Sequence, residues 1–524
     1  MIKNKLQKFN ITFVFIRRYF LCSFLVLLIF LTFYPCLKAN FITFDDPQHF
    51  LNNDSVLVLT VDSVESIFSQ TVNNIYIPLS TLSFAIEHFF FGFNTFVFHL
   101  DNILLHIIVV LLVFFLAKRM GLSVEGAFFA ALIFGIHPMK VESVAWATER
   151  KDVLYSFFYV LALHQYWSYL NNKSISSYLW TLVFGLISML AKPMALSLPL
   201  ILFLFDRFSG RLINKNVFVE KIPFLIYIAE IGSLSYLFNL RNPINDILQA
   251  VLTWIWCFDF YIWKFIWPYH VSFIYIIPQP ISLNNFPYMC SLLMFILIIG
   301  AVIRWRKNRF LFFAFGYYFF SIFFILRFDN QVDFTIVSDR FMYLPCLGFC
   351  LLAGAGVGQY LKPKKFLIPF VVLYIVFAGF QTFQQCQIWH DDISLLSDAI
   401  NRYPKFYKAY YCRGVGYGFT KQYDLALSDF TRAIDLNPIY IKSYNMRAKT
   451  YAFLGRYKEA LKDINTVIML DQSNIGGYLS RADIEEQAHD FLHSKEDYIF
   501  FQQMSGILYK DKIDELNKKL KIQG

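Results

Sequence analysis

One apolar run decides the fold: Tyr19-Phe-Leu-Cys-Ser-Phe-Leu-Val-Leu-Leu-Ile-Phe-Leu-Thr-Phe-Tyr-Pro-Cys-Leu37 contains no charged residue. A helix needs about 20 such residues to cross the hydrocarbon core of a bilayer, so the run predicts a membrane span. The next motif, Phe41-Ile-Thr-Phe-Asp-Asp-Pro47, then brings two carboxylates to the membrane surface. Basic residues precede the run as in a signal peptide, but its length and the lack of a small-residue cleavage site predict an uncleaved span.

The composition indicates a polytopic membrane protein with a second, water-soluble part. Of the 524 residues, 57% are hydrophobic and 16% are charged, with 62 Phe. A soluble core cannot hide that much apolar surface, whereas membrane helices can turn it toward lipid. The chain is membrane-like up to about Gln385 and becomes polar from His390 onward. We therefore expect a membrane domain over residues 1–388 and a soluble domain over residues 389–524.

Basic loops predict the topology, because Lys and Arg near span ends mark the cytoplasmic side. By this rule the N-terminus is inside, and the loop with the two aspartates is outside. The Trp-rich stretch Ile247–Trp267 is interpreted as an interfacial or re-entrant helix, since a full span there would place the basic loop Arg304–Arg309 outside. About eleven spans result, and the soluble domain follows on the outer side. They are Tyr19–Leu37, Phe98–Ala117, Gly126–Ile136, Val153–Leu170, Tyr178–Leu190, Met194–Phe205, Pro223–Leu240, Pro287–Ile303, Phe310–Leu326, Val337–Gly356 and Phe366–Phe383.

Net charge and cysteines argue against other classes of protein. The net charge of +10 is concentrated in short loops between apolar runs, and no basic-aromatic nucleic-acid motif is present. We therefore expect no nucleic-acid partner. The eight cysteines lie mostly in apolar runs, with neither metal-ligand spacing nor a disulfide framework.

The soluble domain repeats itself every 34 residues, which is the period of tetratricopeptide helix pairs. Units are expected near residues 407–440, 441–474 and 475–508, after a half-unit at Ile393–Pro404. Small residues should stand where paired helices touch, at Gly414, Ala426, Ala448 and Ala460. The pattern predicts an α-solenoid, which serves either as a packing scaffold or as a concave surface for an acceptor protein or peptide.

Two polar islands carry the residues suited to chemistry. Asp45 and Asp46 form the first, and His137-Pro-Met-Lys-Val-Glu-Ser-Val-Ala-Trp-Ala-Thr-Glu-Arg-Lys-Asp152 forms the second. Acids beside a basic, His-containing loop at one membrane face favour chemistry on a phosphate-bearing lipid. A carboxylate can take a proton from an acceptor hydroxyl, and cations can hold a leaving phosphate. The expected cations are Lys140, Arg150, Lys151, Lys192 and Arg340.

Each of these residues also has a purely structural interpretation. The aspartates could be a solvated loop or a helix cap, and Arg150 and Lys151 could be charges that flank a span. Lys192 and Pro193 could form a simple hairpin turn, and Arg340 could be a structural ion pair at a helix start. Inside one span, His99, Asn102 and His106 share a helix face, where hydrogen bonds between helices are favoured over a proton path.

A family resemblance rests on motifs that follow one another along nearly the whole chain. They are Phe44-Asp-Asp-Pro47, Tyr76-Ile-Pro-Leu-Ser-Thr-Leu-Ser-Phe84, Phe91-Gly-Phe-Asn94, His99–His106, His137–Trp146, Glu149-Arg-Lys-Asp152, Ala191-Lys-Pro-Met194 and Ser338-Asp-Arg-Phe-Met-Tyr-Leu-Pro345. The chain resembles the transmembrane and tetratricopeptide repeat-containing O-mannosyltransferases and their bacterial relatives, which have the type C glycosyltransferase fold. It departs from that family in its short repeat array and in an abbreviated segment between Leu240 and Asp246. It also has Asp101 at a position where an apolar residue is expected.

The resemblance implies an inverting glycosyltransferase without metal or other cofactor. It implies transfer of a sugar, mannose in this family, from a polyprenyl phosphate to Ser or Thr hydroxyls of proteins at the periplasmic or lumenal face. A bacterial inner membrane is the expected location. Asp45 or Asp46 would be the base, and Arg150, Lys151, Lys192 and Arg340 would bind the donor phosphate. His137 and Glu142 would support the sugar or phosphate site.

Two other functions compete with this interpretation. A membrane-anchored scaffold would use the repeats to recruit envelope proteins and would need none of the acidic or basic residues above. A transporter of lipid-linked sugar would move its substrate without a covalent product, but matched Gly/Pro-interrupted spans typical of inverted repeats are missing from the sequence.

Overall fold

The computed structural model describes residues 2–237, 246–323, 325–326, 336–360 and 365–523. It divides into two compact units, Met1–Asp391 and Asp392–Gly524. The predicted boundary after residue 388 coincides with the C-terminal end of helix α17 (Ile368–Ile388). Both units are helical, and within the described ranges the only β-pairing is an isolated bridge between Val72 and Ile75. The expected fold class, a polytopic helical membrane domain followed by a helical repeat domain, is confirmed.

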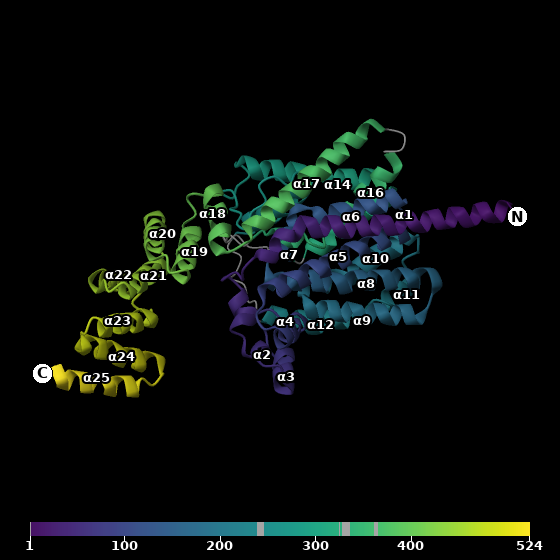
Figure 1. Ribbon diagram of the computed structural model, residues 1–524. Helices are drawn as coiled ribbons and strands as arrows, with labels where there is room; N and C mark the ends of the chain where they lie inside the picture. The colour runs from purple at the N-terminus through teal and green to yellow at the C-terminus, as the bar shows by residue number, and fades with distance from the viewer. Residues whose placement is uncertain (1, 238–245, 324, 327–335, 361–364, 524) are drawn as a thin grey trace. The chain divides into compact units, whose positions relative to one another are not determined.

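A helix lies within each of the predicted spans of the first unit, over at least part of the span. Figure 1 shows several of them, among them α5, α8 and α9, running side by side. The helices of this unit are α1 (Ile2–Phe33), α2 (Asp54–Leu57), α3 (Val61–Ser69), α4 (Pro78–Phe91), α5 (Thr95–Arg119), α6 (Val124–Ile136), α7 (Val141–Ala145), α8 (Arg150–Asn172), α9 (Ile175–Ala191), α10 (Leu198–Ser209), α11 (Lys215–Val219), α12 (Ile222–Leu237), α13 (Ile247–Ile266), α14 (Phe286–Arg304), α15 (Arg309–Ile322), α16 (Leu347–Tyr360) and α17.

Four of the described helices are both long and apolar enough to cross a membrane by themselves, namely the Arg17–Lys38 segment, α5, α14 and α17. The pair formed by α6 and Pro138–Ala145, bent by 58°, would add a fifth if it is one broken span. Helices α9, α15 and α16 are apolar but shorter. The number of eleven spans stays a prediction, and so does the interfacial position of α13. The end of the predicted span Pro223–Leu240 and most of the segment Leu240–Asp246 lie outside the described residues.

Two parts of the membrane unit differ from the sequence-based boundaries. Helix α16 begins at Leu347, ten residues after the predicted start at Val337, because Asp339–Met342 forms a 3-10 turn that packs against the second polar island. The segment after Asp46 was not assigned any helix from the sequence, yet it folds into α2, α3 and α4. These helices pack on α5 through an aromatic core that includes Phe50, Phe84 and Phe98.

Close helix packing holds the centre of the membrane unit together. Helices α6 and α16 cross at Gly126 and Gly354, where a Cβ atom on either glycine would collide with the backbone oxygen of the other. Small residues allow such a close backbone approach, and this is a common basis of helix association in membranes. The crossing fixes α6 relative to α16, and the second polar island leaves the C-terminal end of α6.

The second unit stacks antiparallel helix pairs. Half-unit helix α18 (Asp392–Arg402) precedes the pairs α19 (Tyr407–Phe419) with α20 (Tyr423–Leu436), α21 (Ile441–Phe453) with α22 (Tyr457–Leu470), and α23 (Ile475–Gln487) with α24 (Phe491–Ser505), and α25 (Lys510–Gln523) follows. The small residues predicted at helix contacts are buried: Ala426, Ala448 and Ala460 have no exposed surface. A Cβ on Gly414 would press on the Phe430 ring at 2.7 Å.

A polar ladder joins successive pairs of the second unit. Arg447 Nε and Nη2 donate to the two carboxylate oxygens of Asp463 in the same pair at 2.7 and 2.8 Å, and Nη1 reaches Thr431 of the preceding pair at 2.9 Å. Equivalent contacts recur one repeat earlier and one repeat later. The other two sets are Arg413 with Asp429 and Ser397, and Arg481 with Asp497 and Asn465.

Candidate functional site

Asp46 ties the two polar islands together. Its carboxylate has no exposed surface and accepts hydrogen bonds from the backbone N–H of Ile42 at 2.7 Å and of Thr148 at 3.1 Å. The Thr148 hydroxyl donates to the same carboxylate. Burial raises the pKa of Asp46 to about 7, although these hydrogen bonds act in the opposite direction. The geometry gives Asp46 a positioning task, because it fixes the first island against the second.

Asp45 lies beside Asp46 in a different environment. Its side chain is partly exposed, and among the described residues no group donates a hydrogen bond to its carboxylate. Its backbone carbonyl accepts from the N–H of His49 at 3.0 Å and so starts the turn that follows. The two adjacent carboxylates are therefore distinguished by structure: one is enclosed and bonded, and the other is open to an incoming group.

The second island is a buried, folded-in segment. Helix α6 ends at Ile136, a 3-10 turn covers Pro138–Lys140, and α7 and a further turn lead into α8. His137 initiates the first turn, since its Nδ1 accepts from the N–H of Met139 at 3.3 Å, and its Nε2 pairs with the carbonyl of Phe265 at 3.0 Å. Both ring nitrogens are thus used in holding the chain, and a role of His137 at a sugar or phosphate site stays a prediction.

Lys140 connects this island to the Ser338–Pro345 motif. Its ammonium donates to the backbone carbonyls of Met342 and Tyr343 and contacts Cys346 Sγ at 2.9 Å. From the other side, His106 of α5 bonds the Tyr343 hydroxyl at 2.7 Å and the Gly135 carbonyl at 2.9 Å. The hydrogen bonds between segments that were predicted for His106 are confirmed.

Three of the predicted cations meet at one acid, Glu149. Lys151 Nζ and Lys192 Nζ each lie 3.1 Å from a Glu149 carboxylate oxygen, and Arg340 Nε lies at 3.5 Å. Burial acts to raise the pKa of Glu149, but the charges of these three cations outweigh it and hold that pKa well below its ordinary value. Glu149 therefore carries its charge, and it keeps the three cations together in a buried cluster.

Two further acids complete this cluster. Glu142 accepts from the Arg340 guanidinium and, at 3.0 Å, from the Arg340 backbone N–H. Asp152 accepts from Lys192 at 2.6 Å and from the Ser143 hydroxyl at 2.9 Å. Burial raises the pKa of Asp152 to about 7, against the opposing effect of Lys192.

Arg150 points away from the cluster of cations. Its guanidinium pairs with Glu87 and donates to Asn102 at 3.0 Å and to the Phe98 carbonyl at 3.1 Å. It also stacks over the Phe84 ring at 4.7 Å. These contacts anchor the start of α8 to α4 and α5. Of Arg150 and Arg340, only Arg340 belongs to the Glu149 cluster. A contact between Arg150 and phosphate stays a prediction.

Sequence reasoning missed several members of the site. Glu149 and Asp152 were recognised only as parts of a motif, and His49 and Thr148 were not singled out. His49 is buried, and its Nδ1 has no hydrogen-bond partner within the described part of the chain. Burial, followed by the nearby charge of Lys151, lowers the pKa of His49 well below its ordinary value, so the imidazole is neutral. In the sequence, the position of His49 one turn after the aspartate pair could have indicated that it belongs to the same site.

An apolar groove of about 610 Å³ adjoins the second island. Phe265, against which the His137 ring stacks at 4.9 Å, is part of its wall. The groove continues between α6, α16 and α17. Its other lining residues are Phe129, Ile133, Ile266, Ala353, Gly356, Val357, Leu367, Phe370, Val371 and Tyr374. In the described ranges no three His, Cys, Asp or Glu side chains are grouped as metal ligands would be.

Comparison with known proteins identifies relatives for both units. Residues 441–474 match the tetratricopeptide repeat model, which is the second predicted unit. The chain is 26% identical over 429 residues to protein O-mannosyl-transferase F38B6.6 of Caenorhabditis elegans, covering 74% of this chain and 59% of the relative. It is 24% identical over 411 residues to protein O-mannosyl-transferase TMTC4 of Homo sapiens, covering 66% of this chain and 55% of the relative.

A shorter match has a higher identity: the chain is 32% identical over 157 residues to human protein O-mannosyl-transferase TMTC1, covering 28% of this chain and 18% of the relative. The chain thus spans little more than half the length of the first two relatives. The apolar helices, the tetratricopeptide unit and these matches agree with the motif-based resemblance. The chain resembles the transmembrane and tetratricopeptide repeat-containing protein O-mannosyl-transferases.

Proposed function

We propose that this protein is an integral membrane glycosyltransferase that moves a sugar from a polyprenyl phosphate to Ser or Thr hydroxyls of an acceptor protein. Mannose is the proposed sugar, by analogy with the names of the relatives. The single observation that carries the proposal is the juxtaposition of an open carboxylate, a buried cluster of cations and an apolar groove around the two polar islands. Transfer from a lipid-linked phosphate needs these three elements together.

Asp45 is the proposed base. Its carboxylate takes the proton of the acceptor hydroxyl while the hydroxyl oxygen attacks the anomeric carbon of the sugar. The bond between that carbon and the phosphate oxygen breaks on the opposite face, so the configuration inverts and the electron pair stays on the phosphate. Asp46, enclosed by Ile42 and Thr148, holds the adjacent residue in place.

Lys151, Lys192 and Arg340 are proposed to receive the leaving phosphate. Arg340 offers a planar fork that matches two phosphate oxygens, and the lysines act as point charges. All three are held near Glu149, so they meet the growing negative charge with little reorganisation. Glu142 orients Arg340, and His137 is proposed to support the site through its stacking on Phe265 of the groove.

The polyprenyl chain is proposed to lie in the groove between α6, α16 and α17. His49, neutral and with a buried Nδ1 that has no hydrogen-bond partner among the described residues, is proposed to hydrogen-bond a sugar hydroxyl. The repeats would present the acceptor at the same membrane face, periplasmic in a bacterium. This side is supported by the basic loops at the other ends of the predicted spans.

The test uses membranes that contain the wild-type chain or the Asp45→Asn, Asp46→Asn double variant. Both receive polyprenyl-phosphate mannose with a radiolabelled sugar and a periplasmic or lumenal protein extract. Label on protein with the wild type alone supports the proposal. Equal labelling by the double variant refutes the role of the acidic pair. A phenotype that depends on residues after Ile388 but not on Asp45, Asp46 and Arg340 would favour the scaffold instead.

A further inference from the structure

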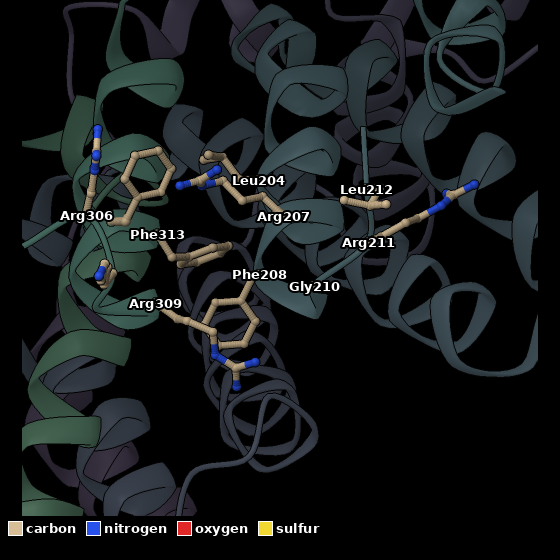
Figure 2. Close-up of a pocket in the computed structure, with 11 residues that line it drawn as sticks. Leu204, Arg207, Phe208, Gly210, Arg211, Leu212, Arg306, Arg309 and Phe313 are labelled. Atoms are coloured by element: carbon tan, nitrogen blue, oxygen red, sulfur yellow. The ribbon is translucent and has the colours of Figure 1, made fainter. Parts of the chain in front are cut away.

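A basic cleft lies at the end of α10 that is remote from Lys192. It has a volume of about 450 Å³ and is formed where the last turn of α10 and the following residues meet the loop between α14 and α15. Its floor is apolar, with Phe208 and Phe313 packed between the two groups of basic side chains (Figure 2). Two hairpins that are far apart in sequence thus bring basic residues to one place. These residues are Arg207, Arg211, Arg306, Lys307 and Arg309.

Most of these cations have no acidic partner in the described part of the chain. Arg211 pairs with Asp206 at 3.0 Å and with Glu220 at 2.6 Å, and in Figure 2 it points away from Arg207. For the other four, no acidic partner occurs among the residues that the structure describes. A cluster of unopposed charge at a membrane boundary attracts an anion.

Aromatic rings hold two of the arginines in defined positions. The Arg207 guanidinium lies 4.3 Å from the centre of the Phe312 ring, and the Arg309 guanidinium lies 5.0 Å from the centre of the Phe208 ring. Such stacking orients a guanidinium and leaves its N–H groups at the rim available as donors. An ordinary solvated loop cation would not be fixed in this way. The cleft is therefore prepared for an anion with several acceptor oxygens.

An apolar groove of about 260 Å³ starts from the floor of the cleft. Leu204 and Phe312 line both the cleft and the groove. From there the groove follows α14 and α15 into the apolar part of the unit. Its remaining lining residues are Phe258, Phe295, Ile298, Ile299, Val302, Ile303, Phe315, Gly316, Phe319 and Phe320. A ligand that fills both spaces has an anionic end and a hydrocarbon end.

We propose that the cleft and groove bind a membrane phospholipid whose headgroup carries two phosphates. The headgroup lies among Arg207, Arg306, Lys307 and Arg309, and one acyl chain lies in the groove between α14 and α15. Four unopposed cations match a headgroup with more than one negative charge better than a zwitterionic one. A free phosphate would use only the cleft and would leave the groove without a function. The lipid site is separate from the proposed transfer site, because α10 leads away from Lys192 toward Arg207.

The experiment measures lipid binding to the full-length chain in detergent by native mass spectrometry. Cardiolipin is the probe with two phosphates, phosphatidylcholine is the zwitterionic comparison, and inorganic phosphate tests the headgroup alone. The variants are Arg207→Gln with Arg309→Gln, and Ile299→Trp, which fills the groove from a side chain that is 44% exposed. The matched control, Lys173→Gln with Lys215→Gln, removes two charges outside the cleft, one just after α8 and one at the start of α11.

We expect cardiolipin to bind at least tenfold more tightly than phosphatidylcholine. The Arg207/Arg309 variant should bind cardiolipin about 25-fold more weakly, since each cation near an anionic headgroup adds about a fivefold factor. Ile299→Trp should also weaken cardiolipin binding, and the Lys173/Lys215 control should bind like the wild type. Thermal unfolding without lipid checks that each variant is folded.

Three results would overturn the proposal. The first is equal affinity of the wild type for cardiolipin and phosphatidylcholine. The second is equal weakening by the control variant, which would show only a general effect of charge. The third is inorganic phosphate binding that competes with cardiolipin while Ile299→Trp leaves cardiolipin binding unchanged, which would reduce the site to an anion cleft.

Discussion

Separate substitution of Asp45 and Asp46 should produce two different defects. Asp45→Asn removes the proposed base from a side chain that the described structure leaves without a hydrogen-bond donor. Loss of a general base lowers kcat by about 10²- to 10⁴-fold. Because no contact is broken, the unfolding temperature should stay close to that of the wild type. The sugar-transfer assay and thermal unfolding in detergent measure the two effects.

Asp46→Asn should instead act on stability, with a defined dependence on pH. The folded-state pKa of Asp46 is about 7, above its ordinary value of 3.8, because burial disfavours the charged carboxylate. The stabilising contribution of the protonated group is fully present below pH 3.8 and is lost as the pH rises through 7. The difference corresponds to on the order of 4 kcal/mol, at about 1.4 kcal/mol per pH unit.

Asparagine does not titrate and keeps only part of the hydrogen bonding of Asp46, because its amide group would face the N–H of Ile42. The wild type should therefore be more stable than Asp46→Asn near pH 5, and this advantage should shrink toward pH 8. Unfolding temperatures measured every half pH unit test the trend. An advantage that is constant, or that grows with pH, would refute the assignment of Asp46 as a buried group with a raised pKa.

Lys192→Met should reduce sugar transfer by at least about 100-fold and destabilise the protein by about 3–5 kcal/mol, because it leaves two buried carboxylates without that cation. The control Lys173→Met lies outside the cluster and should change neither the transfer rate nor the unfolding temperature. Gly354→Val should lower the unfolding temperature by forcing α6 from α16, at a cost of about 1–3 kcal/mol, whereas Gly300→Val meets open space and should be neutral. Asp463→Asn should speed hydrogen exchange of the backbone amides in α21 and α22 about 30-fold, since a hydrogen bond to a charged group contributes about 2 kcal/mol to stability. Unchanged exchange rates would contradict a stabilising role of the polar ladder.

The repeat unit was largely predictable because its period dictates its packing. Positions such as Gly414 and Ala448 recur in fixed register and lie where paired helices touch. The polar ladder was not predicted. Arg447 and Asp463 stand 16 residues apart on different helices, and in sequence each is indistinguishable from a solvated residue on a helix surface.

In the membrane unit, the sequence located the polar residues but did not reveal how their charges are balanced. Lys192 and Arg340 were expected to face a phosphate, and the acid between them, Glu149, was not expected to be their common partner. Which opposite charges form an ion pair can be told only once the positions of the helices in space are known, because the partners are distant in sequence. Arg150 illustrates the same limit, since its partner Glu87 belongs to α4, a helix that was not among the predicted spans.

The ladder of the second unit makes the array modular. Each arginine bonds an aspartate within its own helix pair and a polar side chain of the preceding pair or, for Arg413, of the half-unit helix α18. All of these positions advance by one period from unit to unit. A duplicated segment of 34 residues would therefore form the same hydrogen bonds with the unit before it and with the unit after it. The array can gain or lose a whole unit by recombination without any new side-chain chemistry, and the length of the repeat surface would change in discrete steps.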